Sequence, residues 1–452
     1  MTEVLKRFNT AKLISFAVGF FGLQFAWQMR IILSGPVTEN LGASPFIFGL
    51  IWLAGPFTGM VVQPLIGALS DKTKSAFGRR RPYLLGGALL SAIALVALPN
   101  SEPIVNWISN QLHLPLPALA ALFFAAVMIW ILDACVNIAQ GPYRALVPDV
   151  VPQEQHAIAN SYISLAIGLG SVIAAATAPF LKWAFDYQMS IPAQFVMAAL
   201  AFTLGMAWTC IFIKEHKYEP TENKEEEKFD FIKSLKDFFA LSPEVGKICW
   251  MQFFTWIGNM CMMIYFTQYA IHRIFAVPDL TVVDEAAKAS FDSAVLNGTN
   301  FSSICFAIFN LVCFLIAIPI GVLAGKYGNK KVHIISMLSM ALAFVGMAFS
   351  VNPVVVAALM GLSGIGWASI CALPFAMLSR YIKPGTEGSV MGIFNIFIAG
   401  PQVFVCTLVS WIINKCAFEI NGMVNYHWEY TFFIGAACLV LASIVAAKVR
   451  EE

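Results

Sequence analysis

One acidic residue, Asp133, lies inside a long apolar segment with an uninterrupted apolar run before it. It is the only acid that we place at depth in such a segment. A carboxylate at the centre of a bilayer costs roughly 2.5 to 3.5 kcal/mol on insertion scales, so its presence needs a reason. Reversible protonation would supply one, because the group is then neutral in one state of the protein and charged in another. The alternative is an acid held permanently in a hydrogen bond between helices.

Two polar residues follow Asp133 along the same segment. Asn137 comes one helical turn later and would be its polar neighbour. Arg144 comes eleven residues later, which on a straight helix is about 16 Å along the same face, and Pro142 can bend the helix between them. We interpret Arg144 either as a gate or hydrogen-bond donor to a substrate, or as a charged anchor at the membrane surface that pairs with Asp149.

Amide and tryptophan side chains recur in the other apolar segments. Amides can pair with carbohydrate hydroxyls, and flat rings offer stacking faces, so together they are candidates for a sugar pocket. Each amide alone is explained equally well as a hydrogen bond between helices. The candidates are Gln24, Trp27, Gln28, Gln63, Trp256, Asn259, Asn395 and Gln402. Arg30 is expected near the outer end of its segment, where a long basic side chain reaches the interface.

No metal site or cofactor is expected. None of the six histidines falls in the middle of an apolar segment, and the ten cysteines include no CxxC pair. Neither a zinc site nor a disulfide framework is therefore indicated.

The elements that must position these residues are membrane-spanning helices. The chain is 59% hydrophobic and 12% charged, whereas soluble domains carry about a quarter charged residues. The net charge of +2 does not suggest a nucleic-acid partner. A spanning helix needs about 20 apolar residues, and twelve segments qualify, near 12–38, 46–70, 82–99, 116–143, 157–181, 190–213, 248–272, 298–325, 332–350, 353–379, 388–414 and 427–447.

The polar segments fix the expected organisation. Residues 214–247 are charged and read as a connector between an N-terminal six-helix bundle, 1–213, and a C-terminal one, 248–452. Short loops rich in Lys and Arg remain cytoplasmic, and such loops follow the second and eighth helices. Both termini are therefore expected in the cytoplasm.

A cluster of charges and glycines follows the second helix. Gly67 and Asp71 precede Arg79, Arg80 and Arg81 in a loop that is expected on the cytoplasmic side. Asp71 can pair with the arginines and with a neighbouring helix end. We interpret the cluster as a latch for one conformation; a simple positive-inside loop would need only the arginines.

The two halves repeat each other. The segment 67–72, Gly-Ala-Leu-Ser-Asp-Lys, recurs as 321–326, Gly-Val-Leu-Ala-Gly-Lys. Pro142 and Pro152 recur at the same spacing as Pro374 and Pro384. Parallel six-helix repeats of this kind build the major facilitator fold, in which the substrate lies near mid-membrane. The predicted fold class is therefore an all-α integral membrane protein with twelve transmembrane helices in two pseudo-repeats.

Several motifs resemble a known family. They are Gln24-Phe25-Ala26-Trp27, Ile51-Trp52-Leu53-Ala54-Gly55-Pro56, Asp71-Lys72-Thr73-Lys74, Phe77-Gly78-Arg79-Arg80-Arg81-Pro82, Gln140-Gly141-Pro142-Tyr143-Arg144, Leu373-Pro374-Phe375-Ala376 and Pro401-Gln402-Val403-Phe404-Val405. Over nearly the whole chain the sequence resembles the sucrose-proton symporters, which belong to the glycoside-pentoside-hexuronide group of the major facilitator superfamily.

The resemblance implies roles for particular residues. The family's proton site falls on Asp133, and its arginine essential for sugar transport falls on Arg144. The second helix carries no acid, whereas sodium-coupled melibiose-type members place carboxylates there, so the resemblance favours protons over sodium. It implies proton-coupled symport of a disaccharide, such as sucrose, maltose or a related glucoside, by alternating access.

Other functions stay open as alternatives: an exporter of sugars or amphipathic compounds with the same fold, or a sodium-coupled glycoside symporter. A membrane enzyme or a sugar sensor is disfavoured, because no catalytic groups cluster at one interface and both termini are short. We expect a monomer in a cell membrane, with a bacterial inner membrane as the expected setting.

Overall fold

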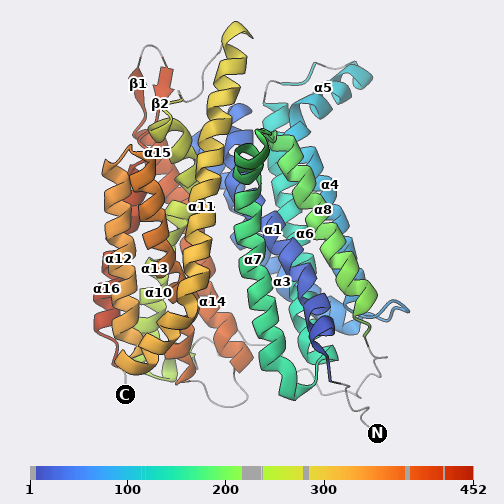
Figure 1. The fold of residues 1–452 in the computed structure, drawn as a ribbon, viewed down its shortest axis with the longest axis vertical. Helices are drawn as coiled ribbons and strands as arrows, with labels where there is room; N and C mark the ends of the chain where they lie inside the picture. The colour runs from blue at the N-terminus through green and yellow to red at the C-terminus, as the bar shows by residue number, and fades with distance from the viewer. Residues whose placement is uncertain are drawn as a thin grey trace. The chain divides into compact units, whose positions relative to one another are not determined.

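The computed structural model describes residues 7–113, 115–117, 119–215, 236, 238–277, 285–381, 387–420 and 423–450. The chain divides into two compact units, which we call unit 1 (Met1–Glu219 with Val282–Ala307) and unit 2 (Pro220–Thr281 with Ile308–Glu452). Both are built from long helices (Figure 1). Helices suit a bilayer because they pair their backbone N–H and C=O groups internally, where no water can do so.

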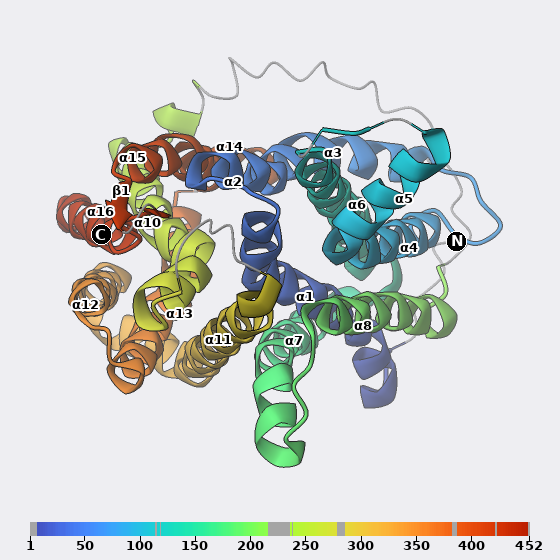
Figure 2. The ribbon, with the colours of Figure 1, turned by 90° about the horizontal axis from the view of Figure 1, so that it is seen from above.

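Unit 1 is a bundle centred on α1 and α6. Its helices are α1 (Thr10–Asn40), α2 (Pro45–Trp52), α3 (Ala54–Lys72), α4 (Arg81–Ala97), α5 (Ser101–Leu112), α6 (Ala120–Val150), α7 (His156–Phe185) and α8 (Ile191–Phe212), with 3-10 turns at Leu98–Asn100 and Gln153–Gln155. In cross-section, α1 packs against α7 and α8, and α6 packs against α3 and α4 (Figure 2).

Unit 2 is a bundle in which α10 packs against α13, α14 and α16 (Figure 2). Its elements are α10 (Pro243–Gln268), a π-helical segment (Tyr269–Ile274), α12 (Asn329–Phe349), α13 (Pro353–Ser379), α14 (Glu387–Phe404), a second π-helical segment (Val405–Val409), α15 (Ser410–Lys415), β1 (Phe418–Ile420), β2 (Met423–Asn425) and α16 (Tyr430–Ala447). The helix α11 (Glu285–Tyr327) belongs to unit 1 up to Ala307 and to unit 2 from Ile308.

The predicted spans correspond to helices. Eleven helical stretches among the described residues have the length and composition of membrane spans. The twelfth predicted span is α10, a 26-residue helix that carries Gln252, Thr255 and Asn259. The helix α13 begins at Pro353, and the Asn352 side chain caps it by accepting from the N–H of Val354 at 2.9 Å.

Four features differ from the sequence prediction. The second span is broken at Leu53 into α2 and α3. The fourth continues to Val150, so that Arg144 and Asp149 lie within α6. The helix α5 and the hairpin of β1 and β2 are additional. Hydropathy misses α5 because its apolar residues recur with a helical period instead of forming a continuous run.

One close contact fixes α1 against α8. A Cβ atom on Gly22 would lie 2.2 Å from the carbonyl oxygen of Ala201. Only glycine lets two backbones approach so closely, as is common between helices in membranes. Arg30, on the same helix, is therefore held by backbone packing about two turns away.

Candidate functional site

Asp133 is fully buried in unit 1 and pairs with Arg30. The Nη2 atom of Arg30, on α1, lies 2.5 Å from Oδ2 of Asp133, on α6. The exposed fractions of the two side chains are 1% and 0%. The expectation that Arg30 reaches the interface is wrong, because pairing with the buried carboxylate satisfies the arginine inside the bundle.

The ion pair is joined by one contact only. Among the described residues, Nε and Nη1 of Arg30 and Oδ1 of Asp133 are buried and have no hydrogen-bond partner. Arg30 also lies against two indole rings, with its Cζ 4.0 Å from the ring centroid of Trp52 on α2 and 5.5 Å from that of Trp27 on α1. Such cation–π contacts hold a guanidinium in place while leaving its remaining N–H groups available.

An amide network continues from the ion pair along α6. Asn137 donates to the backbone oxygen of Asp133 and to Oγ1 of Thr58, both at 2.9 Å. Its own Oδ1 accepts from Gln63 of α3 at 2.8 Å, and Gln63 also donates to Gln140 at 3.0 Å. The predicted proximity of Asn137 to Asp133 is confirmed. On α3, Gly55 lies beside Asp133 and Gly59 lies beside Asn137, and a Cβ at either position would make only ordinary van der Waals contact.

The other predicted site residues of α1 differ in how deeply they are buried. Gln28 is buried, with 3% of its surface exposed. Gln24 and Trp27 are half-buried. The ring of Trp27 lies near both Arg30 and Gly55. On the same helix, Trp27 and Gln24 lie about one and two turns before Arg30, whereas Gln28, two residues before it, lies on a different face.

Arg144 lies apart from the ion pair. It is exposed, and among the described residues no hydrogen bond or ion pair joins it to a partner. Asp149, its proposed anchor partner, instead pairs with Arg79 and Arg80. The interpretation of Arg144 as an anchor held by Asp149 is therefore wrong.

The candidates in unit 2 are neutral. Asn259 is fully buried, and neither its nitrogen nor its oxygen has a partner among the described residues. Trp256 meets the ring of Trp367 edge-on at 5.8 Å. Asn395 is exposed, and Gln402 donates to the carbonyl of Ile398 in its own helix at 3.1 Å.

Sequence reasoning missed Gln252, which lies seven residues before Asn259 on α10. It is fully buried, and both of its amide atoms lack a partner among the described residues. Residues 252, 256 and 259 lie on one face of the helix because of their spacing. This spacing could have identified Gln252 from the sequence, together with Trp256 and Asn259.

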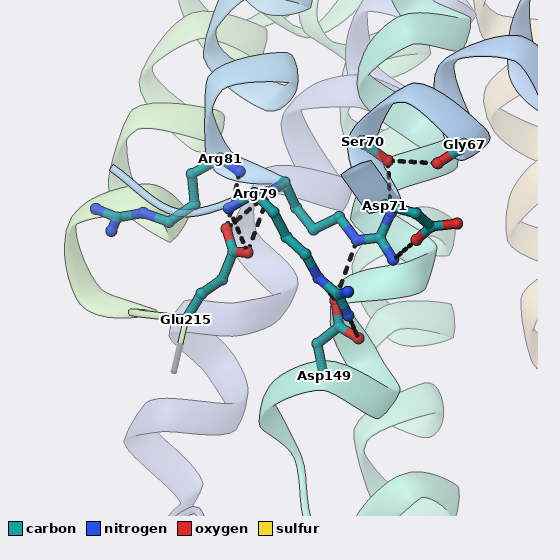
Figure 3. Close-up of polar contacts among 8 residues, drawn as sticks. Gly67, Ser70, Asp71, Arg79, Arg81, Asp149 and Glu215 are labelled. Carbon is teal, nitrogen blue, oxygen red and sulfur yellow. Dashed lines mark hydrogen bonds and ion pairs between the residues drawn. The ribbon is translucent and has the colours of Figure 1, made fainter. Parts of the chain in front are cut away.

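The predicted latch residues of unit 1 do assemble into a cluster (Figure 3). Arg80 lies 2.5 Å from Asp71 and 3.0 Å from Asp149, and it donates to Oγ of Ser70 at 2.5 Å. Arg79 forms a two-point pair with Asp149, at 2.5 and 3.2 Å. We call this set, with Arg81 and Glu215, the arginine cluster; it joins the ends of α3, α4 and α6.

Glu215 is the member that the sequence did not reveal. It follows α8, and its carboxylate accepts from the backbone N–H groups of Arg79, Arg80 and Arg81 at 2.8 to 3.0 Å (Figure 3). Gly78 makes this possible, because its φ is +107° and a Cβ there would lie 2.5 Å from Glu215. The Gly67 position is open, and its part is to accept a hydrogen bond from Ser70 at 2.8 Å.

Comparison with known proteins gives curated relatives with similar sequences. A general alpha-glucoside permease of Schizosaccharomyces pombe is 29% identical over 307 residues, covering 66% of this chain and 54% of the permease, so the match spans about half of that protein. Sucrose transport protein SUT2 of Oryza sativa subsp. japonica is 28% identical, covering 87% and 85% of the two chains. Sucrose transport protein SUC4 of Arabidopsis thaliana is 25% identical, covering 85% and 80%.

Solved structures share the fold. The nucleoside transporter NupG matches with a TM-score of 0.67 at 14% identity, over 98% of this chain and 99% of that chain. A peptide transporter POT matches with a TM-score of 0.63 at 14% identity, over 98% and 96%. The sequence model of the Major Facilitator Superfamily matches residues 14–287 and 248–452. With its long apolar helices and this match over nearly its whole length, the chain is a multi-pass membrane protein that belongs to the Major Facilitator Superfamily.

Proposed function

We propose that this protein is a secondary active transporter that carries a disaccharide together with a proton by alternating access. The named relatives act on sucrose and alpha-glucosides, so sucrose, maltose or a related glucoside is the proposed substrate. The observation that carries the coupling is the fully buried Asp133, paired with Arg30 through one contact. A charge so placed is a functional site by default in a membrane protein.

The proposed cycle follows from charge neutrality. With Asp133 ionised, the Arg30–Asp133 pair has no net charge, which the membrane interior tolerates better than an isolated charge. Protonation removes the negative partner and changes the energy of the site. Protonation leaves Arg30 as a buried charge without its partner, so the protein then favours a different conformation; we infer that this is the one in which the sugar-loaded carrier reorients, and that release of the proton on the other side resets the cycle.

A proton is favoured over sodium by the residues of the second span. Between Pro45 and Ser70 the chain carries no acid, so Asp133 has no second carboxylate from this span with which to coordinate a metal cation. Hard cations such as sodium prefer several oxygen ligands. Import is proposed over export because the polar residues of α1, α3 and α6 offer amides to sugar hydroxyls. We propose no enzymatic activity for this protein.

The other candidates take supporting roles in this proposal. Gln24, Trp27, Gln28, Gln63 and Asn137 would contribute to sugar binding from unit 1, and Trp256, Asn259, Asn395 and Gln402 from unit 2. Arg144 would act as a gate or sugar donor, and the arginine cluster would latch one conformation. We further propose a monomer in a cell membrane with both termini in the cytoplasm.

Sugar uptake into proteoliposomes tests the coupling. Wild-type protein should accumulate labelled sucrose or maltose when the outside is made acidic, and Asp133→Asn should lose this accumulation. Undiminished accumulation by Asp133→Asn would rule out its proton role. The matched control is Asp186→Asn, which alters an exposed carboxylate in the same unit.

Arg144 is tested separately. Arg144→Ala should abolish sugar uptake while expression and folding persist. Because Arg144 holds no ion pair in the described structure, its loss should not unfold the protein. Unchanged transport kinetics would remove it from the transport pathway.

A further inference from the structure

Arg30 has more hydrogen-bonding capacity than its surroundings use. A guanidinium stays charged in proteins and carries five N–H donors. Here Nη2 is paired with Asp133, whereas Nε and Nη1 are buried without a partner among the described residues. A buried donor without an acceptor is costly, so these groups point to an acceptor that arrives during function.

The Asp133 carboxylate also has an oxygen atom without a partner among the described residues. Its Oδ2 is bound by Arg30, and its Oδ1 is buried without a partner in the described part of the chain. A proton from water can therefore add at Oδ1 without first displacing a protein group. The added proton forms one O–H bond, and the weakened Oδ2 contact then frees Nη2 of Arg30.

We propose that Arg30 is a sugar-binding residue whose donors become available to substrate hydroxyl oxygens when Asp133 is protonated. This rests on the proposed proton-coupled function and names the residue that links the two events. Hydroxyl oxygens are neutral acceptors, and hydrogen bonds from a charged donor to them are stronger than bonds between neutral groups. The indole ring of Trp27, which is half-buried and lies near the guanidinium, offers an apolar face to a sugar ring.

No competing charge among the described residues pairs with this site. Arg30 is the one charged group that forms an ion pair with Asp133, and the Pro45–Ser70 stretch of α2 and α3 contains no charged residue. The other titratable or charged groups on the surrounding helices lie toward helix ends or further along α6. They are Lys12 and Glu39 of α1, Asp71 and Lys72 of α3, Arg81 and Tyr83 of α4, Cys135, Tyr143, Arg144 and Asp149 of α6, His156, Tyr162 and Lys182 of α7, and Cys210 of α8.

The proposal makes binding of the sugar and the proton mutually dependent. By linkage, if protonation of Asp133 raises sugar affinity, then sugar raises proton affinity by the same factor. An ionised Asp133 competes with the sugar for Arg30, and a protonated one does not. Sugar affinity in the wild-type protein should therefore rise as the pH falls.

Equilibrium binding of labelled sucrose or maltose to the purified full chain tests this, between about pH 5.5 and about pH 8. Wild-type affinity should fall toward alkaline pH. Asp133→Asn should keep the high, acid-like affinity at every pH, because Arg30 is always released. Arg30→Gln should lower the affinity at acid pH by roughly tenfold or more, the loss of one charge-assisted hydrogen bond, and should flatten the pH profile.

Two further variants keep the outcome decisive. Lys182→Gln removes an exposed positive charge from the same unit and should match the wild type at every pH. If Arg30→Gln does not fold, Arg30→Gln with Asp133→Asn restores neutrality; it should bind at least tenfold more weakly than Asp133→Asn alone, by roughly the same lost bond. Equal affinity of these two variants would overturn the proposal.

Failure of this inference is distinguishable from failure of the proposed function. If Asp133→Asn loses proton-driven accumulation while Arg30→Gln keeps the wild-type affinity and pH profile, then Asp133 couples protons without Arg30 binding sugar. If Asp133→Asn still accumulates sugar, the proton role itself is wrong, and the sugar-binding role of Arg30 falls with it.

Discussion

The two units bury polar groups in different ways. Unit 1 encloses an ion pair and an amide network in which Asn137 uses both its nitrogen and its oxygen. In unit 2, the buried amides of Gln252 and Asn259 are neutral and have no partners among the described residues. A charged side chain inside the membrane is much more costly without a partner than a neutral amide is. Among the described residues, unit 1 thus buries a paired charge, whereas unit 2 buries unpaired neutral amides.

The two units also differ in the ion pairs at their helix ends. The arginine cluster of unit 1 combines Arg79 and Arg80 with the acids Asp71, Asp149 and Glu215. In unit 2, Lys247 pairs with Glu244 in the same helix at 2.7 Å and donates to the carbonyl of Lys448 at 3.0 Å. Unit 1 joins several helices through multivalent arginines, a geometry that lysine cannot provide.

The largest expected effect comes from breaking the buried ion pair. Asp133→Ala should lower the free energy of unfolding by roughly 3 to 5 kcal/mol, because it leaves the Arg30 charge buried without a partner. Arg30→Met combined with Asp133→Leu should be near neutral, since both charges are removed. Denaturant titration in detergent micelles measures both. A single variant as stable as the double variant would contradict the importance of the pair.

The arginine cluster should show the next largest effect. Arg80 is 5% exposed and contacts Asp71, Asp149 and Ser70, so Arg80→Gln should destabilise the protein by about 2 to 3 kcal/mol. Lys247→Gln in unit 2 should lower stability by only about 0.5 to 1 kcal/mol, because the lysine is half-exposed and makes one ion pair and one hydrogen bond to the carbonyl of Lys448. Thermal unfolding measures the stability of both variants. If Arg80→Gln and Lys247→Gln lose the same stability, the proposed difference between the helix ends of unit 1 and unit 2 is wrong.

A matched pair of amide substitutions compares the two interiors directly. Asn137→Leu should destabilise by about 1 to 2 kcal/mol, because three hydrogen bonds between or within helices are lost. Asn259→Leu should be neutral or stabilising, since no such bond is lost. The free energy of unfolding of each variant decides the matter. A costly Asn259→Leu would show that unit 2 holds its amides by contacts of its own.

The smallest effect is expected at an exposed pair. Lys182 donates to Asp186 at 2.6 Å, and this hydrogen bond and the lysine charge lower the pKa of Asp186. A lowered folded-state pKa means that the stabilising contribution exists above the unfolded pKa and is lost as the pH falls through the folded one. Water screens the pair, so Asp186→Asn should leave the unfolding midpoint at neutral pH unchanged. Titration of the Asp186 carboxyl carbon by NMR measures the pKa; a value above that of a free aspartate would contradict the pairing.

Much of the site was predictable from single residues. Asp133 stood out because an acid in an apolar run is costly, and Asn137 stood out because one helical turn separates them. Both lie on one helix, where spacing dictates proximity. The role of Arg30 was not predictable in this way. We expected it near the outer end of its span, where reaching the interface is the ordinary behaviour, but it lies ten residues before the end of α1, and only the packing of α1 and α2 onto α6 brings it to Asp133.

The sequence by itself determined the helices, their two-fold repeat and the expected cytoplasmic side, because hydropathy and loop charge act locally along the chain. Only the tertiary structure decided the partners: Arg30 for Asp133, Gln63 for Asn137, and Glu215 for the backbone of the arginine cluster. These contacts join residues 74 to 136 positions apart. Pairing over such separations depends on which helix faces meet, and packing of the whole bundle sets that, through contacts such as that of Gly22 with Ala201.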